Sequence, residues 1–149
     1  RKTDFVSSTK IDRLLEILTD IHENHEDEKV IVFSQFVSFL DMLEGPIKQA
    51  FGKKSMGRFQ GSMNAKARNE MVQKFEGSED MNILLVSLKC GSLGLNLTCA
   101  NHVVLTDLWY TTLLKKVEPA VENQAIDRVY RLGQQKDVEV HRIVIAGSI

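Results

Sequence analysis

Two arginines, Arg128 and Arg131, stand three residues apart in a segment whose composition favours a helix. Side chains at positions i and i+3 are neighbours on a helical surface, so the two guanidinium groups would lie on the same face. A guanidinium group is permanently charged and presents a rigid fork of donors that matches phosphate oxygens. The spacing therefore suits a polyphosphate ligand, and a solvated basic face would show the same pattern.

A second candidate segment, residues 87–98, follows a predicted buried strand and is rich in small residues. It contains Ser87, Lys89, Gly94 and Asn96. Small residues after a strand allow backbone amides to approach an anion closely. The segment could hold a phosphate, and its glycines could equally make a tight turn.

A third candidate is Gly61–Ser62, which ends another predicted strand just before a helix. Its amides and the Ser62 hydroxyl could hold a nucleic-acid phosphate. Capping of the helix by Ser62 or Asn64 is the alternative. Similarly, Ser34 and Gln35 follow the first apolar run, where they could contact a sugar or phosphate or form a turn.

The elements that must position these residues alternate between strands and helices. Short continuous apolar runs predict strands buried on both faces, and apolar positions at helical spacing predict helices. The predicted strands cover residues 30–33, 55–59, 82–87, 102–106 and 138–145. The predicted helices run from a cap at Ser8–Thr9 to Ile21, then over residues 37–50, 64–75 and 121–130. Such alternation predicts an α/β fold with a mostly parallel sheet, helices on both faces, and ligands beyond the carboxyl ends of the strands.

Composition sets limits on the function. The 149 residues, 43% of them hydrophobic, suit one domain over residues 1–149 with a substantial core. With 19 basic and 20 acidic residues, the net charge of -1 requires that any nucleic-acid contact come from local patches. No apolar run approaches the ~18 residues that span a membrane, so we expect no membrane partner.

Several kinds of site are not predicted. The four histidines and two cysteines show no metal-ligand spacing, and no nucleophilic triad is evident. The sequence also lacks G-x-x-x-x-G-K-S/T, the Walker A loop that cradles ATP phosphates. We therefore expect that the chain alone cannot supply a complete ATP site and that it is a fragment of a longer protein.

Together these segments resemble the C-terminal RecA-like lobe of SWI/SNF-type ATPases, within helicase superfamily two. Val30 to Phe36 resembles the opening motif of that lobe, Phe59 to Ser62 its Gly-Ser step, and Ser87 to Thr98 its fifth motif. Gln124 to Gln134 resembles its sixth motif. The subgroup it most resembles is the RING-finger DNA-repair translocases and the helicase-like transcription factor. The resemblance implies a three-layer αβα lobe.

The resemblance also implies a division of labour in ATP hydrolysis. A separate N-terminal RecA-like lobe would hold ATP and Mg²⁺, and this lobe would close over them. Arg128 and Arg131 would then serve as catalytic arginine fingers. Gly94 and Asn96 would help to shape the ATP-binding cleft, and Gln124 would support the fingers.

For nucleic acid, the resemblance implies sequence-independent contact with the backbone of double-stranded DNA. The implied contact residues are Ser34, Gln35, Gly61, Ser62, Ser87 and Lys89. Cycles of lobe closure would drive translocation in DNA repair or chromatin remodelling. A nuclear location is a further implication of the family.

The sequence departs from the family at one important place. The family normally joins an Asp-Pro-Trp-Trp-Asn motif directly to Pro-Ala-Val-Glu, whereas here residues 111–118 separate Asp107–Tyr110 from Pro119. This insert could displace the arginines, which motivates one alternative, a degenerate lobe that binds DNA or protein without supporting hydrolysis. A DEAD-box-like RNA helicase lobe is a second alternative, disfavoured by Gln134. A small-molecule-binding domain is a third, disfavoured because no Gly-x-Gly-x-x-Gly follows a strand.

Overall fold

The computed structural model describes residues 2–25, 27–34, 36–59, 63–87, 99–106 and 139–143. In this part of the chain lie three helices, α1 (Lys2–Asn24), α2 (Val37–Phe51) and α3 (Ala65–Gly77). The strands are β1 (Val30–Ser34), β2 (Met56–Arg58), β3 (Ile83–Ser87), β4 (His102–Leu105) and β5 (Glu139–Arg142). Among these described residues, no helix is both long and apolar enough to cross a membrane.

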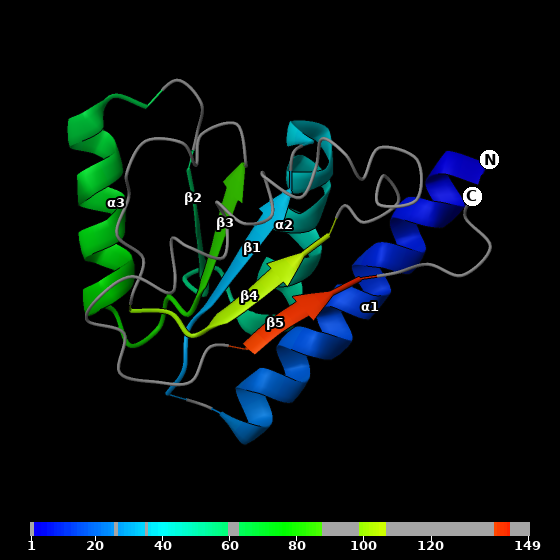
Figure 1. Cartoon of the computed structure of the whole chain (residues 1–149), viewed down its shortest axis with the longest axis horizontal. Helices are drawn as coiled ribbons and strands as arrows, with labels where there is room; N and C mark the ends of the chain where they lie inside the picture. Colours follow the sequence, from blue (N-terminus) through cyan, green and yellow to red (C-terminus); the bar gives the residue numbers. More distant parts are fainter. Residues whose placement is uncertain are drawn as a thin grey trace.

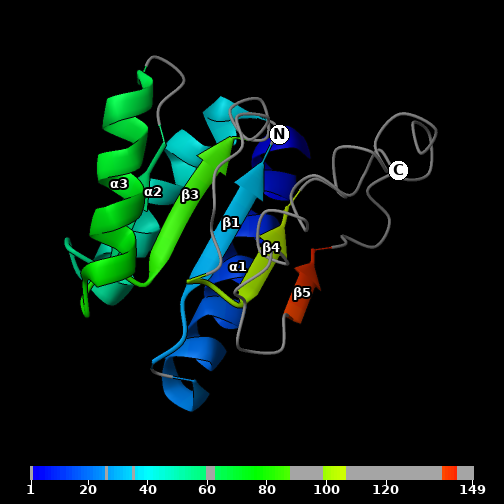
Figure 2. The ribbon, with the colours of Figure 1, turned by 60° about the vertical axis from the view of Figure 1, so that its left-hand side comes forward.

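The strands form one sheet in the order β2-β3-β1-β4-β5, and every pair of neighbours is parallel. Figure 1 shows β1 between β3 and β4, and Figure 2 shows the arrows pointing the same way. The predicted parallel α/β sheet is thus confirmed. Because the strands are parallel, the segments that follow them all leave from one edge of the sheet, the carboxyl edge.

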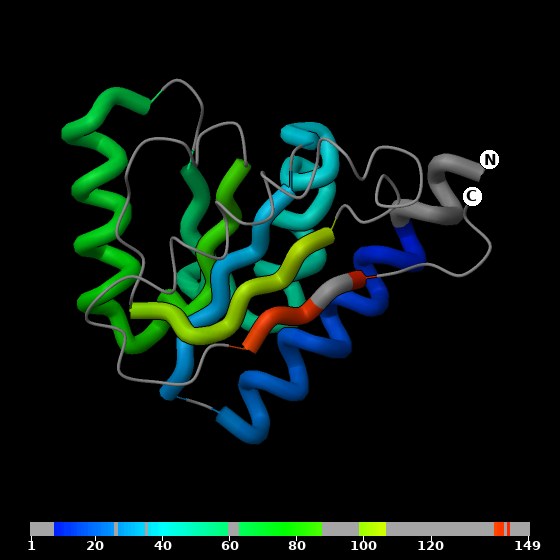
Figure 3. Tube along the Cα trace, in the orientation of Figure 1, coloured from blue at the N-terminus to red at the C-terminus, as the bar shows by residue number. Residues whose placement is uncertain are grey.

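Helices cover both faces of the sheet, which makes the three layers that the resemblance implied. On one face, Val30 and Val32 of β1 pack in a cluster with buried residues of α1 and α2. On the other face, Ile31 and Phe33 pack with Phe75 of α3. All five residues of β1 are buried, which explains its continuous apolar run. In Figure 3 the trace of α3 lies on the opposite side of the sheet from α1.

Helix α1 has the predicted apolar face, but the predicted start of this helix is wrong. Its buried residues Leu14, Leu18 and Ile21 follow the predicted helical spacing. However, the helix begins at Lys2, so Ser8 and Thr9 lie inside it and do not cap it. Ser and Thr cost only about 0.5 kcal/mol each in a helix interior, so a helix with a strong apolar face can continue through them.

A buried lysine joins the start of β1 to the connection between α3 and β3. Lys29 Nζ donates hydrogen bonds to Ser78 O at 2.6 Å, to Met81 O at 2.8 Å and to Asn82 Oδ1 at 3.2 Å. The same ammonium group lies 5.1 Å from the centre of the Phe75 ring. Burial lowers the pKa of Lys29. Its three hydrogen bonds therefore hold the amino edge of the sheet to the end of α3.

Candidate nucleotide and DNA-binding edge

The carboxyl edge brings two predicted contact residues together. Ser34 ends β1, Ser87 ends β3, and the two are partners in the strand register. Phe59 follows β2 on the same edge, and its N–H donates to Leu85 O at 3.0 Å. The topology therefore places the ends of β1, β2 and β3 at the same edge of the sheet.

Both serines are buried at this edge. Ser34 is fully buried, and Ser87 is 3% exposed. The N–H of Phe36 donates to Ser34 Oγ at 3.0 Å, so Ser34 forms the turn that leads into α2. The neighbouring Thr106 donates its hydroxyl to Phe33 O at 3.1 Å. Ser34 thus makes the predicted turn, and its contact with DNA remains a prediction.

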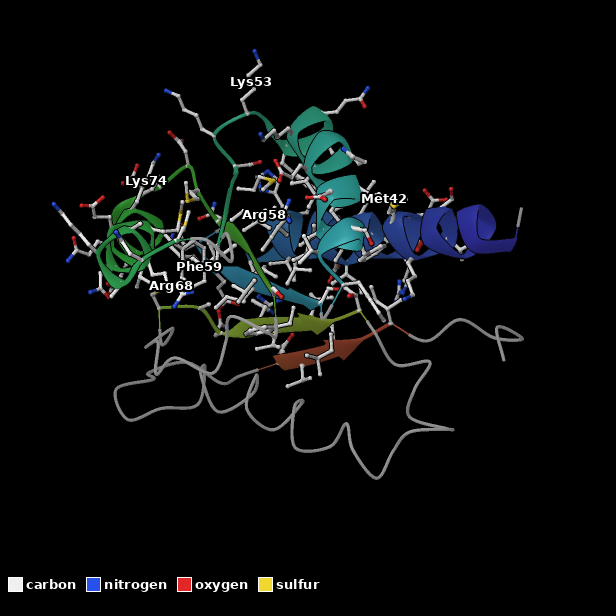
Figure 4. All side chains as sticks on the ribbon, turned by 90° about the horizontal axis from the view of Figure 1, so that it is seen from above. Met42, Lys53, Arg58, Phe59, Arg68 and Lys74 are labelled. Carbon is white, nitrogen blue, oxygen red and sulfur yellow. The ribbon has the colours of Figure 1, made fainter. Side chains whose placement is uncertain are left out.

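The start of α3 settles which residue caps it. Asn64 Oδ1 accepts a hydrogen bond from the N–H of Ala67 at 2.8 Å, the geometry of an N-terminal cap. The N-terminus of this helix, with its partial positive charge, therefore lies directly after residues 60–62 in the sequence. Lys66 and Lys74 are exposed on α3, and Arg68 is half-buried. Figure 4 shows Arg68 and Lys74 on this helix.

One charged residue at this edge was not predicted from the sequence. Arg58 ends β2, is buried, and lies between this strand and α2 (Figure 4). Its Nη1 lies 2.5 Å from Asp41 Oδ1 and 2.6 Å from Glu44 Oε2. Burial opposes the charge, but hydrogen bonds to Glu44 and Asp41 raise the pKa of Arg58 above its ordinary value. This cluster fixes the strand that leads into residues 59–62.

A signal for the Arg58 cluster exists in the sequence. Arg58 interrupts an apolar strand, and Asp41 and Glu44 are three residues apart on the preceding helix. Residues three apart share a helical face, so both carboxylates can reach one guanidinium group. Their pairing with Arg58 depends on how α2 packs against β2, which the sequence pattern does not specify.

Most of the predicted site residues lie outside the described residues. These are Gln35, Gly61, Ser62, Lys89, Gly94, Asn96, Gln124, Arg128 and Arg131. The predicted helix over residues 121–130 and the insert at residues 111–118 also lie outside them. Their assignments therefore stay predictions.

A model of the helicase conserved C-terminal domain matches residues 9–133. The chain belongs to this family. The match covers the apolar core strands β1, β3 and β4 as well as the segments that carry the candidate residues. The helicase C-terminal domain therefore includes the carboxyl edge described above.

Relatives of this helicase C-terminal domain include DNA repair proteins of fungi. The DNA repair protein rad8 of Schizosaccharomyces pombe is 40% identical over 144 residues, which make up 97% of this chain and 12% of that protein. The DNA repair protein RAD5 of Cryptococcus neoformans is 43% identical over 149 residues, or 99% of this chain and 12% of that protein. The chain thus spans only about an eighth of the length of these curated relatives.

Solved structures of ATPases share the fold. The C-terminal part of the Fun30 ATPase domain matches with a TM-score of 0.81 and 33% identity, covering 93% of this chain and 41% of that one. The Sulfolobus solfataricus SWI2/SNF2 ATPase core in complex with dsDNA matches with a TM-score of 0.70 and 28% identity, covering 91% of this chain and 26% of that one. The predicted resemblance to a SWI/SNF-type C-terminal lobe, with its RecA-like fold, is confirmed.

Proposed function

We propose that this helicase C-terminal domain is the second motor lobe of an ATP-dependent translocase on double-stranded DNA. The observation that carries the proposal is the likeness to the Sulfolobus SWI2/SNF2 core, which was solved with dsDNA. The names of the fungal relatives support a role in DNA repair. A nuclear location and a chromatin substrate are further parts of the proposal.

For ATP hydrolysis, a partner lobe of the same protein would hold ATP and Mg²⁺, since this chain has no Walker A loop. Arg128 and Arg131 would approach the γ-phosphoryl group when the lobes close, with Gln124 supporting them. Charge stabilisation of this kind is worth ~10³ to 10⁵ in rate in comparable phosphoryl-transfer enzymes. Gly94 and Asn96 would shape the cleft between the lobes. The isolated lobe should therefore not hydrolyse ATP.

For DNA, the segments at the carboxyl edge would contact the sugar-phosphate backbone of one strand. The proposed contact residues are Ser34, Gln35, Gly61, Ser62, Ser87 and Lys89. Support comes from the sheet topology, which sets Ser34 beside Ser87 and places the end of β2 at the same edge. Backbone contacts predict binding that does not depend on sequence and that weakens with salt.

The insert at residues 111–118 supports a second candidate, a lobe that binds DNA or protein without supporting hydrolysis. The insert precedes the segment that carries both arginines. Displacement of a catalytic group by about 1 Å can reduce the rate ~10²-fold. The deletion described next separates this candidate from the working motor.

The first test measures steady-state ATP hydrolysis by the two-lobed protein, with and without duplex DNA. We expect duplex-stimulated turnover that Arg131→Ala abolishes, while DNA affinity stays within a few-fold. Arg13→Ala is the matched control, because Arg13 is exposed on α1 and pairs only with its helical neighbour Glu16 at 3.5 Å among the ion pairs described. Normal hydrolysis by Arg131→Ala would disprove the finger assignment. Turnover that appears only after deletion of residues 111–118 would favour the binding lobe, and stimulation by RNA alone would favour an RNA helicase.

The second test concerns the DNA contact of Lys89. Lys89→Ala should weaken DNA binding and reduce the slope of log affinity against log salt by about one. Lys53→Ala, at an exposed lysine in the connection between α2 and β2, is the control. An unchanged salt slope in Lys89→Ala would remove Lys89 from the DNA-binding surface.

A further inference from the structure

Three of the four histidines gather at the amino edge of the sheet, opposite the candidate nucleotide and DNA-binding edge. His102 is the first residue of β4, His141 lies in β5, and His25 directly follows α1. The His102 ring stacks on that of His141 at 5.5 Å between centres, and it lies 5.3 Å from the ring of His25. Glu28 and Glu139 complete the group. These residues are far apart in the sequence, so their meeting depends on the fold.

Three side-chain atoms of this group are spaced like the ligands of a zinc ion. His102 Nδ1 lies 3.3 Å from His141 Nε2 and 3.6 Å from Glu139 Oε2, and the last two atoms are 3.8 Å apart. Zinc bonds to nitrogen and oxygen of about 2.0–2.2 Å in a tetrahedron separate the ligand atoms by about 3.3–3.6 Å. The observed spacing requires only a few tenths of an ångström of closure.

The second nitrogen of His102 has the partner that a metal-bound imidazole usually has. Its Nε2 lies 2.6 Å from Glu28 Oε1, the distance of a hydrogen bond. When Nε2–H donates to the carboxylate, Nδ1 carries the free lone pair and faces the other two ligands. A carboxylate behind a ligating histidine in this way orients the ring and increases its basicity.

A competing set, His25, Glu28 and His102, fits a metal less well. There, His102 Nε2 and Glu28 Oε1 are 2.6 Å apart, which is too close for two ligands of one tetrahedral ion. His25 Nδ1 lies 3.2 Å from the same Glu28 oxygen. His25 therefore serves as a second partner of the carboxylate that orients His102.

We propose that His102 Nδ1, His141 Nε2 and Glu139 bind a divalent transition-metal ion of the zinc class, with Glu28 as the positioning residue behind His102. Imidazole and carboxylate are ligands that zinc accepts. The His102 side chain is fully buried, whereas that of Glu139 is 53% exposed. The buried ligand fixes the site, and the exposed side leaves a path for the ion and a position for water as fourth ligand.

The ion would join two neighbouring strands at the amino edge. His102 begins β4, and Glu139 and His141 belong to β5, the end strand of the described sheet. Binding to the folded state alone would stabilise the pairing of β5 with β4.

The test titrates the full chain, freed of metal with a chelator, with Zn²⁺ against a chromophoric competitor. We expect one Zn²⁺ per chain with a dissociation constant of about 1 μM or tighter, and a Zn²⁺-dependent rise of several degrees in melting temperature. His141→Ala should weaken binding at least 30-fold, and Glu139→Gln about 10-fold. Glu28→Gln, which removes the orienting charge, should also weaken it about 10-fold. Because Glu139 is exposed, Glu139→Gln retains the fold and keeps the test decisive if His141→Ala is unstable.

The matched control is His22→Ala. His22 is exposed on α1, outside the group. Its ring packs edge-on with the Phe51 ring, with 5.8 Å between the ring centres. Its loss should leave Zn²⁺ affinity unchanged, and a Co²⁺-substituted chain should show no thiolate charge-transfer band, which excludes cysteine ligands. Less than 0.2 equivalents of bound Zn²⁺, or equal affinity in the wild type and in His141→Ala and Glu139→Gln, would refute the site. The histidines would then form a hydrogen-bonded cluster only.

Discussion

In the Arg58 cluster, loss of the arginine and loss of its two carboxylate partners should have unequal effects on stability. The Arg58 side chain is 7% exposed, whereas Glu44 is 31% exposed and Asp41 is 62% exposed. Removal of the arginine leaves two carboxylates that water can still reach. Removal of both carboxylates leaves a buried guanidinium group whose remaining described acceptor is Val37 O, at 3.5 Å. The second change should therefore cost more stability than the first.

The magnitudes follow from these exposures. Buried hydrogen bonds to charged groups contribute about 1.5–3 kcal/mol, and exposed ion pairs contribute about 0.2–1 kcal/mol. Arg58→Met, which retains an apolar side chain, should lower the free energy of unfolding by about 2 kcal/mol. Asp41→Ala with Glu44→Ala should lower it by about 3 kcal/mol, because an uncompensated buried charge costs about 3–5 kcal/mol and Val37 O provides partial relief.

The assay is urea unfolding followed by far-ultraviolet circular dichroism, with all three changes also combined in one variant. Once Arg58 is absent, the two acid substitutions should cost less than about 0.5 kcal/mol more, since their partner is gone. The reasoning is refuted if Arg58→Met costs more than the acid pair, or if the acid substitutions cost the same with and without Arg58. Loss of the cluster should also weaken DNA binding in the two-lobed protein, because β2 leads into residues 59–62.

Three further predictions concern other parts of the fold. Lys29→Met should lower the free energy of unfolding by about 2–3 kcal/mol, because it leaves the buried Met81 carbonyl and the half-buried Ser78 carbonyl without their shared donor. Gly57→Val should cost about 1–3 kcal/mol, since even a Cβ at this position would lie 2.8 Å from the sulfurs of Met71 and Met81. Cys99 should alkylate about 100-fold more slowly at pH 8 than a thiol of ordinary pKa, because burial, followed by Glu76, raises its pKa to about 11 and only the thiolate reacts.

Each of these predictions has a matched control. Lys53→Met, at an exposed lysine, should change the stability by less than about 0.5 kcal/mol, and an equal effect of the two lysines would contradict the role of Lys29. Gly45→Ala in α2 has open space around the added Cβ and should stabilise the helix by up to about 1 kcal/mol. Alkylation of Cys99 is measured in a Cys90→Ser background, and a rate that does not rise between pH 8 and pH 11 would contradict the raised pKa.

The sequence predicted the sheet well because its central strands are buried on both faces. Burial on both faces demands continuous apolar runs, and β1 and β3 begin and end within one residue of their predicted bounds. The predicted start of α1 was wrong because Ser and Thr are common helix caps and are also acceptable inside a helix, where Ser8 and Thr9 lie. Local preference does not choose between these two uses, whereas the packing of the whole helix does.

Of the two candidate sites, one could be predicted from the sequence and the other could not. The meeting of Ser34 and Ser87 at one edge followed from parallel topology alone, which a pattern of alternating elements specifies. The sequence did not predict the histidine group, because its members show no metal-ligand spacing along the chain. Glu28 and His102 are 74 residues apart in sequence, and only the pairing of strands brings such residues together.

The parallel sheet also keeps its two candidate sites apart. His102 begins β4 and Thr106 directly follows it, and four residue steps along a parallel strand span about 13 Å. An ion bound at the amino edge would therefore not meet a nucleotide or a DNA phosphate at the carboxyl edge. The two sites share only the rigid strands between them. An ion at the amino edge can stabilise β4 and β5 without entering the chemistry of ATP, so the experiments on the two sites can succeed or fail separately.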